Sequence, residues 1–172
     1  MDHSDAVKTA ECVGDRLEAR GEDLATVESC TGGLLGSTIT DVPGASGYFD
    51  RGYVTYSNRA KLSLGVTRES LEGHGAVSET VAREMAQAAR DAAGTTWAVS
   101  TTGIAGPSGG TPEKPVGTVY VGIAHAGPWG SEETDTAVEH RRYDGSRTEI
   151  KGAVVEGALA VIASALDRFE SQ

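Results

Sequence analysis

The chain has 172 residues, of which 38% are hydrophobic and 5% aromatic, and its formal net charge is −10. This charge argues against nonspecific nucleic-acid binding, which needs a basic surface. Two cysteines are too few for a disulfide framework or a zinc site, and the apolar runs are too short to cross a bilayer. Asp2 and Asp5 do not suit a signal peptide. We therefore expect one domain over residues 1–172 in the cytoplasm, with no metal, cofactor, nucleic-acid or membrane partner.

Apolar periodicity and the placing of glycine, proline and capping residues divide the chain into helices and strands. The predicted elements are a helix at 5–20, a strand at 24–28, a helix to about 40, a strand at 48–56, short helices at 57–65 and 67–71, a helix at 79–93, strands at 97–102, 116–124 and 134–143, and a helix at 147–169. This alternation predicts an α/β fold, a three-layer α/β/α domain with a mixed, mostly parallel sheet. No helix separates the last two strands, so we expect them to pair antiparallel.

The segment Glu-Ser-Cys-Thr-Gly-Gly at 28–33 joins a predicted strand to a predicted helix. In open α/β sheets, ligands bind outside the carboxyl ends of the strands, and a helix N-terminus offers free amides to an anion. Ser29 is therefore a candidate nucleophile, and the backbone of Thr31, Gly32 and Gly33 is a candidate oxyanion or phosphate site. The alternative is a serine that only caps the helix.

A lysine suits the role of base for this serine better than a histidine. None of the four histidines lies at a strand end with other polar candidates, and the Gly-x-Ser-x-Gly elbow is missing. Lys61, one of only four lysines, lies about one helical turn after Tyr56, and burial would lower its pKa enough to make it a base. The alternative is a surface lysine with its amine in solvent. Adjacent strand residues point to opposite faces, so only one of Ser29 and Cys30 should meet Lys61.

Hydroxyl and glycine residues follow a second predicted strand, near Thr102 and Gly103. Glycines there would let the backbone approach a ligand, although a glycine-rich turn without a ligand explains them equally well. The segment 107–115 contains three prolines and is expected to form a surface loop that could cover the site. Arg147 starts the last helix and could reach a phosphate, the alternative being an ordinary surface arginine.

Five segments in a fixed order resemble the CinA C-terminal domain family, named after the competence/damage-inducible protein CinA. They are residues 28–33, 52–61, 75–78, 103–107 and 114–119. The likeness runs from about residue 5 to 168. Thr102 stands where relatives often have serine, which keeps a hydroxyl at this position. Some members carry an additional N-terminal domain, which we do not expect in this chain.

Members of this family include nicotinamide-nucleotide amidases, which hydrolyse the carboxamide of nicotinamide mononucleotide to nicotinate mononucleotide and ammonia. The resemblance implies Ser29 as the nucleophile, Lys61 as its base, and Tyr56, Thr102 and Gly103 as support for this pair or the substrate. The partners expected are a small nucleotide substrate and further copies of the chain in a homo-oligomer. A nucleotide-binding or regulatory module without catalysis, or an amidase for another small amide, are the alternatives.

Overall fold

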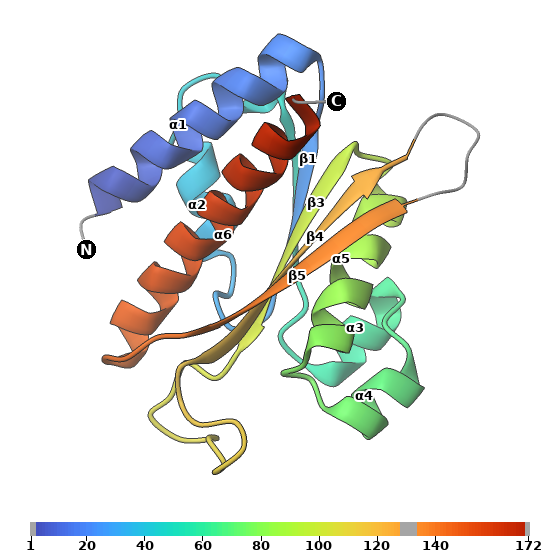
Figure 1. Ribbon diagram of the computed structural model, residues 1–172, viewed down its shortest axis with the longest axis vertical. Coiled ribbons are helices and arrows are strands. Elements are labelled where there is room, and N and C mark those ends of the chain that lie inside the picture. The colour runs from blue at the N-terminus through green and yellow to red at the C-terminus, as the bar shows by residue number, and fades with distance from the viewer. Residues whose placement is uncertain (1–2, 128–133, 171–172) are drawn as a thin grey trace.

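The structure is a computed structural model that describes residues 3–127 and 134–170 (Figure 1). At its centre lies a five-stranded sheet with the order β2-β1-β3-β4-β5. The strands are β1 (Leu24–Glu28), β2 (Phe49–Val54), β3 (Trp97–Gly103), β4 (Thr118–Ala126) and β5 (Thr134–Arg142). β1 runs parallel to both β2 and β3, whereas β4 is antiparallel to β3 and to β5. The predicted mixed sheet is confirmed, and its parallel part has three carboxyl ends at one edge.

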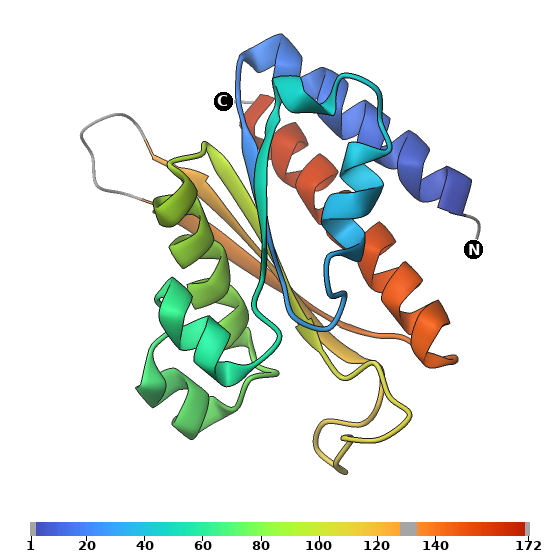
Figure 2. The same ribbon diagram turned by 180° about the vertical axis from the view of Figure 1, so that it is seen from behind.

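Helices cover both faces of this sheet. They are α1 (His3–Arg20), α2 (Leu34–Thr40), α3 (Asn58–Leu64), α4 (Arg68–His74), α5 (Glu79–Ala93) and α6 (Arg147–Glu170), with a short 3-10 turn η1 (Ala45–Gly47) before β2. α1, α2 and α6 lie on one side, while α3, α4 and α5 lie on the other, as the two opposite views show (Figures 1 and 2). The three-layer α/β/α architecture predicted from the sequence is therefore confirmed.

Side-chain caps explain where the helices of the second layer begin. The hydroxyl groups of Ser57, Thr67 and Ser78 accept hydrogen bonds from backbone amides three residues ahead, at the starts of α3, α4 and α5. Such caps satisfy amides that have no partner within the helix. The cap at Ser57 sets the phase of α3 and so directs Lys61, one turn later, into the interior.

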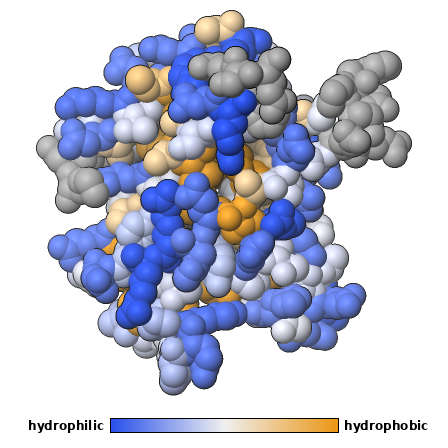
Figure 3. Space-filling view, in the orientation of Figure 1, coloured by the Kyte–Doolittle hydropathy of each residue, from blue (hydrophilic) through white to orange (hydrophobic). Residues whose placement is uncertain are grey.

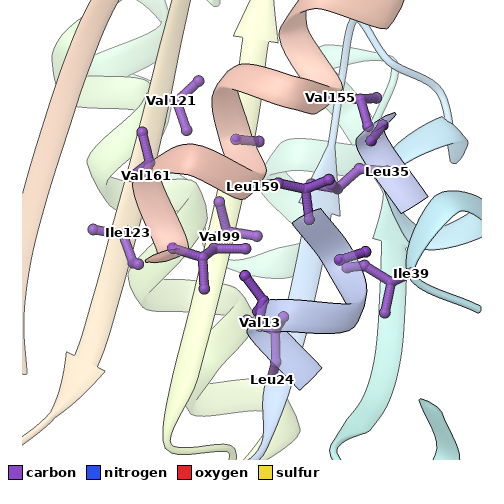
Figure 4. Close-up of a cluster of buried hydrophobic side chains, with 14 of the residues drawn as sticks. Val13, Leu24, Leu35, Ile39, Val99, Val121, Ile123, Val155, Leu159 and Val161 are labelled. Carbon is purple, nitrogen blue, oxygen red and sulfur yellow. The ribbon is translucent and has the colours of Figure 1, made fainter. Parts of the chain in front are cut away.

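Two apolar clusters hold the layers together. The larger one lies between the sheet and the first helix layer (Figure 4). It includes Leu24, Val99, Val121 and Ile123 from the strands and Val13, Leu35, Ile39, Val155, Leu159 and Val161 from the helices. The smaller cluster packs Val81, Met85 and Ala89 of α5 against the opposite face. Truncating a buried leucine to alanine typically lowers the free energy of unfolding by about 2–5 kcal/mol. The packing in these clusters therefore contributes strongly to the stability of the sheet whose strand ends form the site.

The face seen in Figure 1 is mostly hydrophilic, with a small hydrophobic area near its centre (Figure 3). Within the described part of the chain, every helix is too short or too polar to cross a membrane.

Candidate active site

A cavity of about 280 Å³ opens at the edge of the sheet where the parallel strands end. The ends of β1 and β3, the segment after β2, the α4–α5 junction and the start of α6 contribute to its lining. The predicted site residues that line it are Ser29, Tyr56, Lys61, Thr102, Gly103 and Arg147. The fold therefore gathers at one place side chains that are more than a hundred residues apart in the sequence.

Ser29 and Lys61 are in direct contact in this cavity. The Lys61 Nζ lies 2.9 Å from the Ser29 Oγ. Ser29 follows β1 directly, and its amide donates to the Thr101 carbonyl at 2.9 Å, which ties the serine backbone to β3. Lys61 is only 1% exposed, so the alternative of a surface lysine is excluded. The Ser29 backbone is thus fixed by a hydrogen bond to β3, and the Lys61 side chain is fixed by its burial.

The surroundings of the Lys61 amine suit a neutral lysine. Its Nζ also lies 2.8 Å from the carbonyl of Thr55 and 3.5 Å from that of Tyr56. In the structure Nζ donates to the Ser29 Oγ and to the Thr55 carbonyl. In the neutral form, which has two N–H donors and one lone pair, the amine can donate to the carbonyls and accept from the Ser29 hydroxyl instead. Burial lowers the pKa of Lys61, because the charged form loses its hydration. Burial therefore favours the neutral form of the Lys61 amine over its charged form.

Cys30, the rival nucleophile, is buried beside this pair. Burial raises the pKa of its thiol to about 12. The thiolate is the reactive form of cysteine, so the thiol stays protonated and unreactive near neutral pH. The expected alternation does not apply here, because β1 ends at Glu28 and Ser29 and Cys30 follow it in a turn where both line the cavity. The hydrogen bond with Lys61 is made by Ser29.

Arg147 and Tyr56 meet at the mouth of the cavity. One terminal nitrogen of Arg147 donates to the Tyr56 hydroxyl at 2.7 Å and the other to the Gly106 carbonyl at 2.6 Å. Tyr56 is 58% exposed, so its hydroxyl lies at the entrance and points to the arginine, not to the Ser29–Lys61 pair. Arg147 thereby connects the segment after β2 with the segment after β3.

Thr102 and Gly103 shape the wall on the β3 side. The Thr102 hydroxyl donates to the Ala76 carbonyl at 2.7 Å and so fixes the α4–α5 junction against the strand. A Cβ atom at position 103 would lie 2.6 Å from the Val119 side chain and 2.8 Å from the Thr118 carbonyl. Glycine is therefore required at 103 by its close approach to β4.

Glu28 takes the place that we expected for an anionic group of the substrate. Its carboxylate is 1% exposed and accepts from the Thr31 hydroxyl at 2.6 Å. It also accepts from the amides of Gly33, Leu35 and Gly36 at 2.9, 3.1 and 2.8 Å. A carboxylate of the protein itself thus occupies the N-terminus of α2, and its negative charge stabilises the helix by interacting with the positive end of the helix dipole.

This arrangement corrects the predicted role of residues 31–33. Thr31 is fully buried and contacts Glu28 and Thr101, the Gly33 amide is already bonded, and Gly32 is not among the residues that line the cavity. Sequence reasoning missed the function of Glu28. The available signal was a carboxylate at the last position of a buried strand, directly before a glycine turn.

Replacing Glu28 by glutamine is expected to lower the free energy of unfolding by about 2–3 kcal/mol, because an amide oxygen cannot satisfy four donors and its NH₂ group faces other donors. Urea unfolding measures this loss. Glu11→Gln on the exposed face of α1 is the matched control and should stay within about 0.5 kcal/mol of the unmodified protein. Equal stability of the two variants would contradict the role given to Glu28.

The sequence and the fold of this chain are similar to those of known proteins. The family model for the CinA C-terminal domain matches residues 6–166. A CinA-like protein of Chlorobaculum tepidum is 51% identical over 156 residues, and a putative competence-damage inducible protein of Symbiobacterium thermophilum is 49% identical over 162 residues. The matches cover 89% and 92% of this chain but only 37% and 38% of those relatives.

Among solved structures, the competence/damage inducible protein CihA from Agrobacterium tumefaciens superposes with a TM-score of 0.88 at 39% identity, covering 95% of this chain and 96% of that one. The fold and the site define a three-layer α/β protein with a serine hydroxyl and a buried lysine amine in contact at the carboxyl edge of the sheet. The chain belongs to the CinA C-terminal domain family. Within the described ranges, no three His, Cys, Asp or Glu side chains are grouped closely enough to hold a metal ion.

Proposed function

We propose that this protein is an amidohydrolase that converts nicotinamide mononucleotide to nicotinate mononucleotide and ammonia. The observation that carries the proposal is the 2.9 Å contact between the Lys61 amine and the Ser29 hydroxyl in an open cavity. A nucleophile and a base within hydrogen-bond reach are the requirement of covalent acyl transfer. The family resemblance provides the substrate.

The reaction proceeds in two halves. Neutral Lys61 takes the Ser29 proton as the oxygen attacks the carboxamide carbon, and the resulting ammonium gives that proton to the leaving nitrogen, so that ammonia departs and an acyl ester on Ser29 remains. A water molecule then loses a proton to Lys61 and attacks the ester carbon. The carboxylic acid leaves, and the proton returns to the Ser29 oxygen.

The charge that develops on the carbonyl oxygen needs donors inside the cavity. The amides of Gly33 and Leu35 at the start of α2 donate to Glu28, so we assign this function to other residues that line the cavity, with Gly103 as the first candidate. Arg147 at the mouth is the cation that would meet the phosphate of the mononucleotide. The excess of acidic residues makes a local cation important for an anionic substrate.

An ammonia-release assay with a panel of amides tests this function. The panel contains nicotinamide mononucleotide, nicotinamide riboside, free nicotinamide, glutamine and asparagine. We expect the mononucleotide to have the highest kcat/KM and the riboside a lower value, because it lacks the phosphate. Calorimetric binding of the mononucleotide without ammonia release would identify a binding module instead, and turnover of another amide alone would identify a different substrate.

A further inference from the structure

The loop 107–115 forms one wall of the cavity. Ser108 and Gly109 line it from the loop, and Ala76 and Val77 line it from the α4–α5 junction. The distance between the loop and this junction therefore affects the width of the cavity. The contacts that hold the loop in this position involve neither Ser29 nor Lys61.

The two arms of the loop pack tightly on each other. A Cβ atom at Gly106 would lie 2.6 Å from the Val116 side chain, and one at Gly110 would lie 2.7 Å from the Val116 amide nitrogen. At the tip, the Thr111 amide donates to the Lys114 carbonyl at 2.9 Å, and the Lys114 amide donates to the Thr111 hydroxyl at 3.0 Å. The loop is thus a preformed unit that can be held at one point.

Lys114 provides such a point. Its Nζ donates at 2.8 Å to the carbonyl of His74, the last residue of α4. A cation is favoured at the carbonyl end of a helix. A Cβ atom at Gly75, where the chain leaves α4 with φ +77°, would lie 3.8 Å from the same Nζ. The amine therefore lies against the backbone that leads directly to the opposite wall at Ala76.

We propose that Lys114 is a positioning residue that latches the loop 107–115 to the end of α4 and thereby sets the width of the cavity for the substrate. Lys114 lies more than thirty residues from His74 in the sequence, and its hydrogen bond joins the two walls from outside. The consequence for substrate binding rests on the proposed amidase function. The hydrogen bond that holds the loop to α4 does not depend on that function. We therefore test the loop position and the substrate binding separately.

Hydrogen exchange of the amides in residues 108–114 tests the latch without any substrate. In Lys114→Met the long apolar stem is kept and the donor is lost, and we expect exchange to be about fivefold faster or more. Lys114→Arg keeps a donor and should stay near the unmodified protein. Lys8→Met, at a lysine that is 73% exposed on α1, is the matched control and should show no change in the loop. Unchanged exchange in Lys114→Met would overturn the latch.

The kinetic measurement uses the same variants with nicotinamide mononucleotide and nicotinamide riboside. We expect Lys114→Met to raise KM about fivefold for both substrates with kcat changed less than about twofold, because the wall moves while the reacting groups stay. A rise in KM for the mononucleotide alone would show a direct phosphate contact and overturn the latch. If the unmodified protein releases no ammonia, the proposed function fails, and the exchange comparison still decides on Lys114.

Discussion

Replacing Ser29 by alanine is expected to reduce ammonia release from nicotinamide mononucleotide by at least about 10,000-fold, because the nucleophile of the acyl-transfer step is removed. The change deletes one oxygen at a half-buried position and should leave thermal unfolding within a few degrees of the unmodified protein. A steady-state ammonia assay with a melting curve on the same sample measures both. The pair of readouts separates loss of chemistry from loss of fold.

Ser63→Ala is the matched control for this experiment. Ser63 is an exposed serine of α3 whose hydroxyl donates to the Arg59 carbonyl, and it does not line the cavity. Its replacement should leave the rate within about twofold, since surface substitutions away from special features have small effects. Substantial activity in Ser29→Ala would refute Ser29 as the nucleophile and would make Cys30 the next candidate for this role.

Replacing Lys61 by methionine or by arginine is expected to lower kcat about 1,000-fold, because both changes remove a group that can accept the serine proton. Arginine restores the positive charge but stays protonated at any accessible pH, so it tests whether charge alone suffices. The measurement is kcat for both variants beside the unmodified enzyme. Activity of Lys61→Arg near that of the unmodified enzyme would contradict a role as base.

The pH profile of the unmodified enzyme extends the same test. In the proposed mechanism the neutral amine is the active form, so kcat/KM should rise with pH and reach a plateau above the pKa of Lys61 in the free protein. Burial lowers this pKa below the ordinary lysine value of 10.5, so the plateau should begin at a lower pH than an exposed lysine would give. A rate that falls as pH rises through neutrality would exclude this assignment.

Much of the secondary structure around the site could be predicted, because the sequence patterns that mark helices and strands are local. Hydroxyl caps at Ser57, Thr67 and Ser78 mark helix starts within three residues, and the apolar patterns of β1 and β3 mark buried strands. The contact of Ser29 with Lys61 was expected partly from elimination of the histidines and partly from the family resemblance. Burial of Lys61 was open until the fold was known.

The contacts that the sequence did not reveal depend on long-range packing. Arg147 reaches Tyr56 across 91 positions of the chain, and Lys114 reaches His74 across 40. No local sequence pattern predicts a contact between residues so far apart in the chain. The role of Glu28 was missed for a different reason. Its place at the end of a buried strand before a glycine turn was a signal, but only the fold shows four donors converging on its carboxylate.

Ser29 and Lys61 lie in a different stretch of the chain from the loop and the helix start that complete the cavity, and this separation bears on how such a protein can diverge. Ser29 follows β1 and Lys61 lies on α3, whereas Ser108 and Gly109 come from the loop after β3 and Arg147 comes from the start of α6. Under the proposed function, changes at Ser108 or Gly109 would therefore alter which amide enters while the Ser29–Lys61 contact is kept. Under the same proposal, variants with randomised residues 108–111 are expected to accept other amide substrates with Ser29 and Lys61 unchanged.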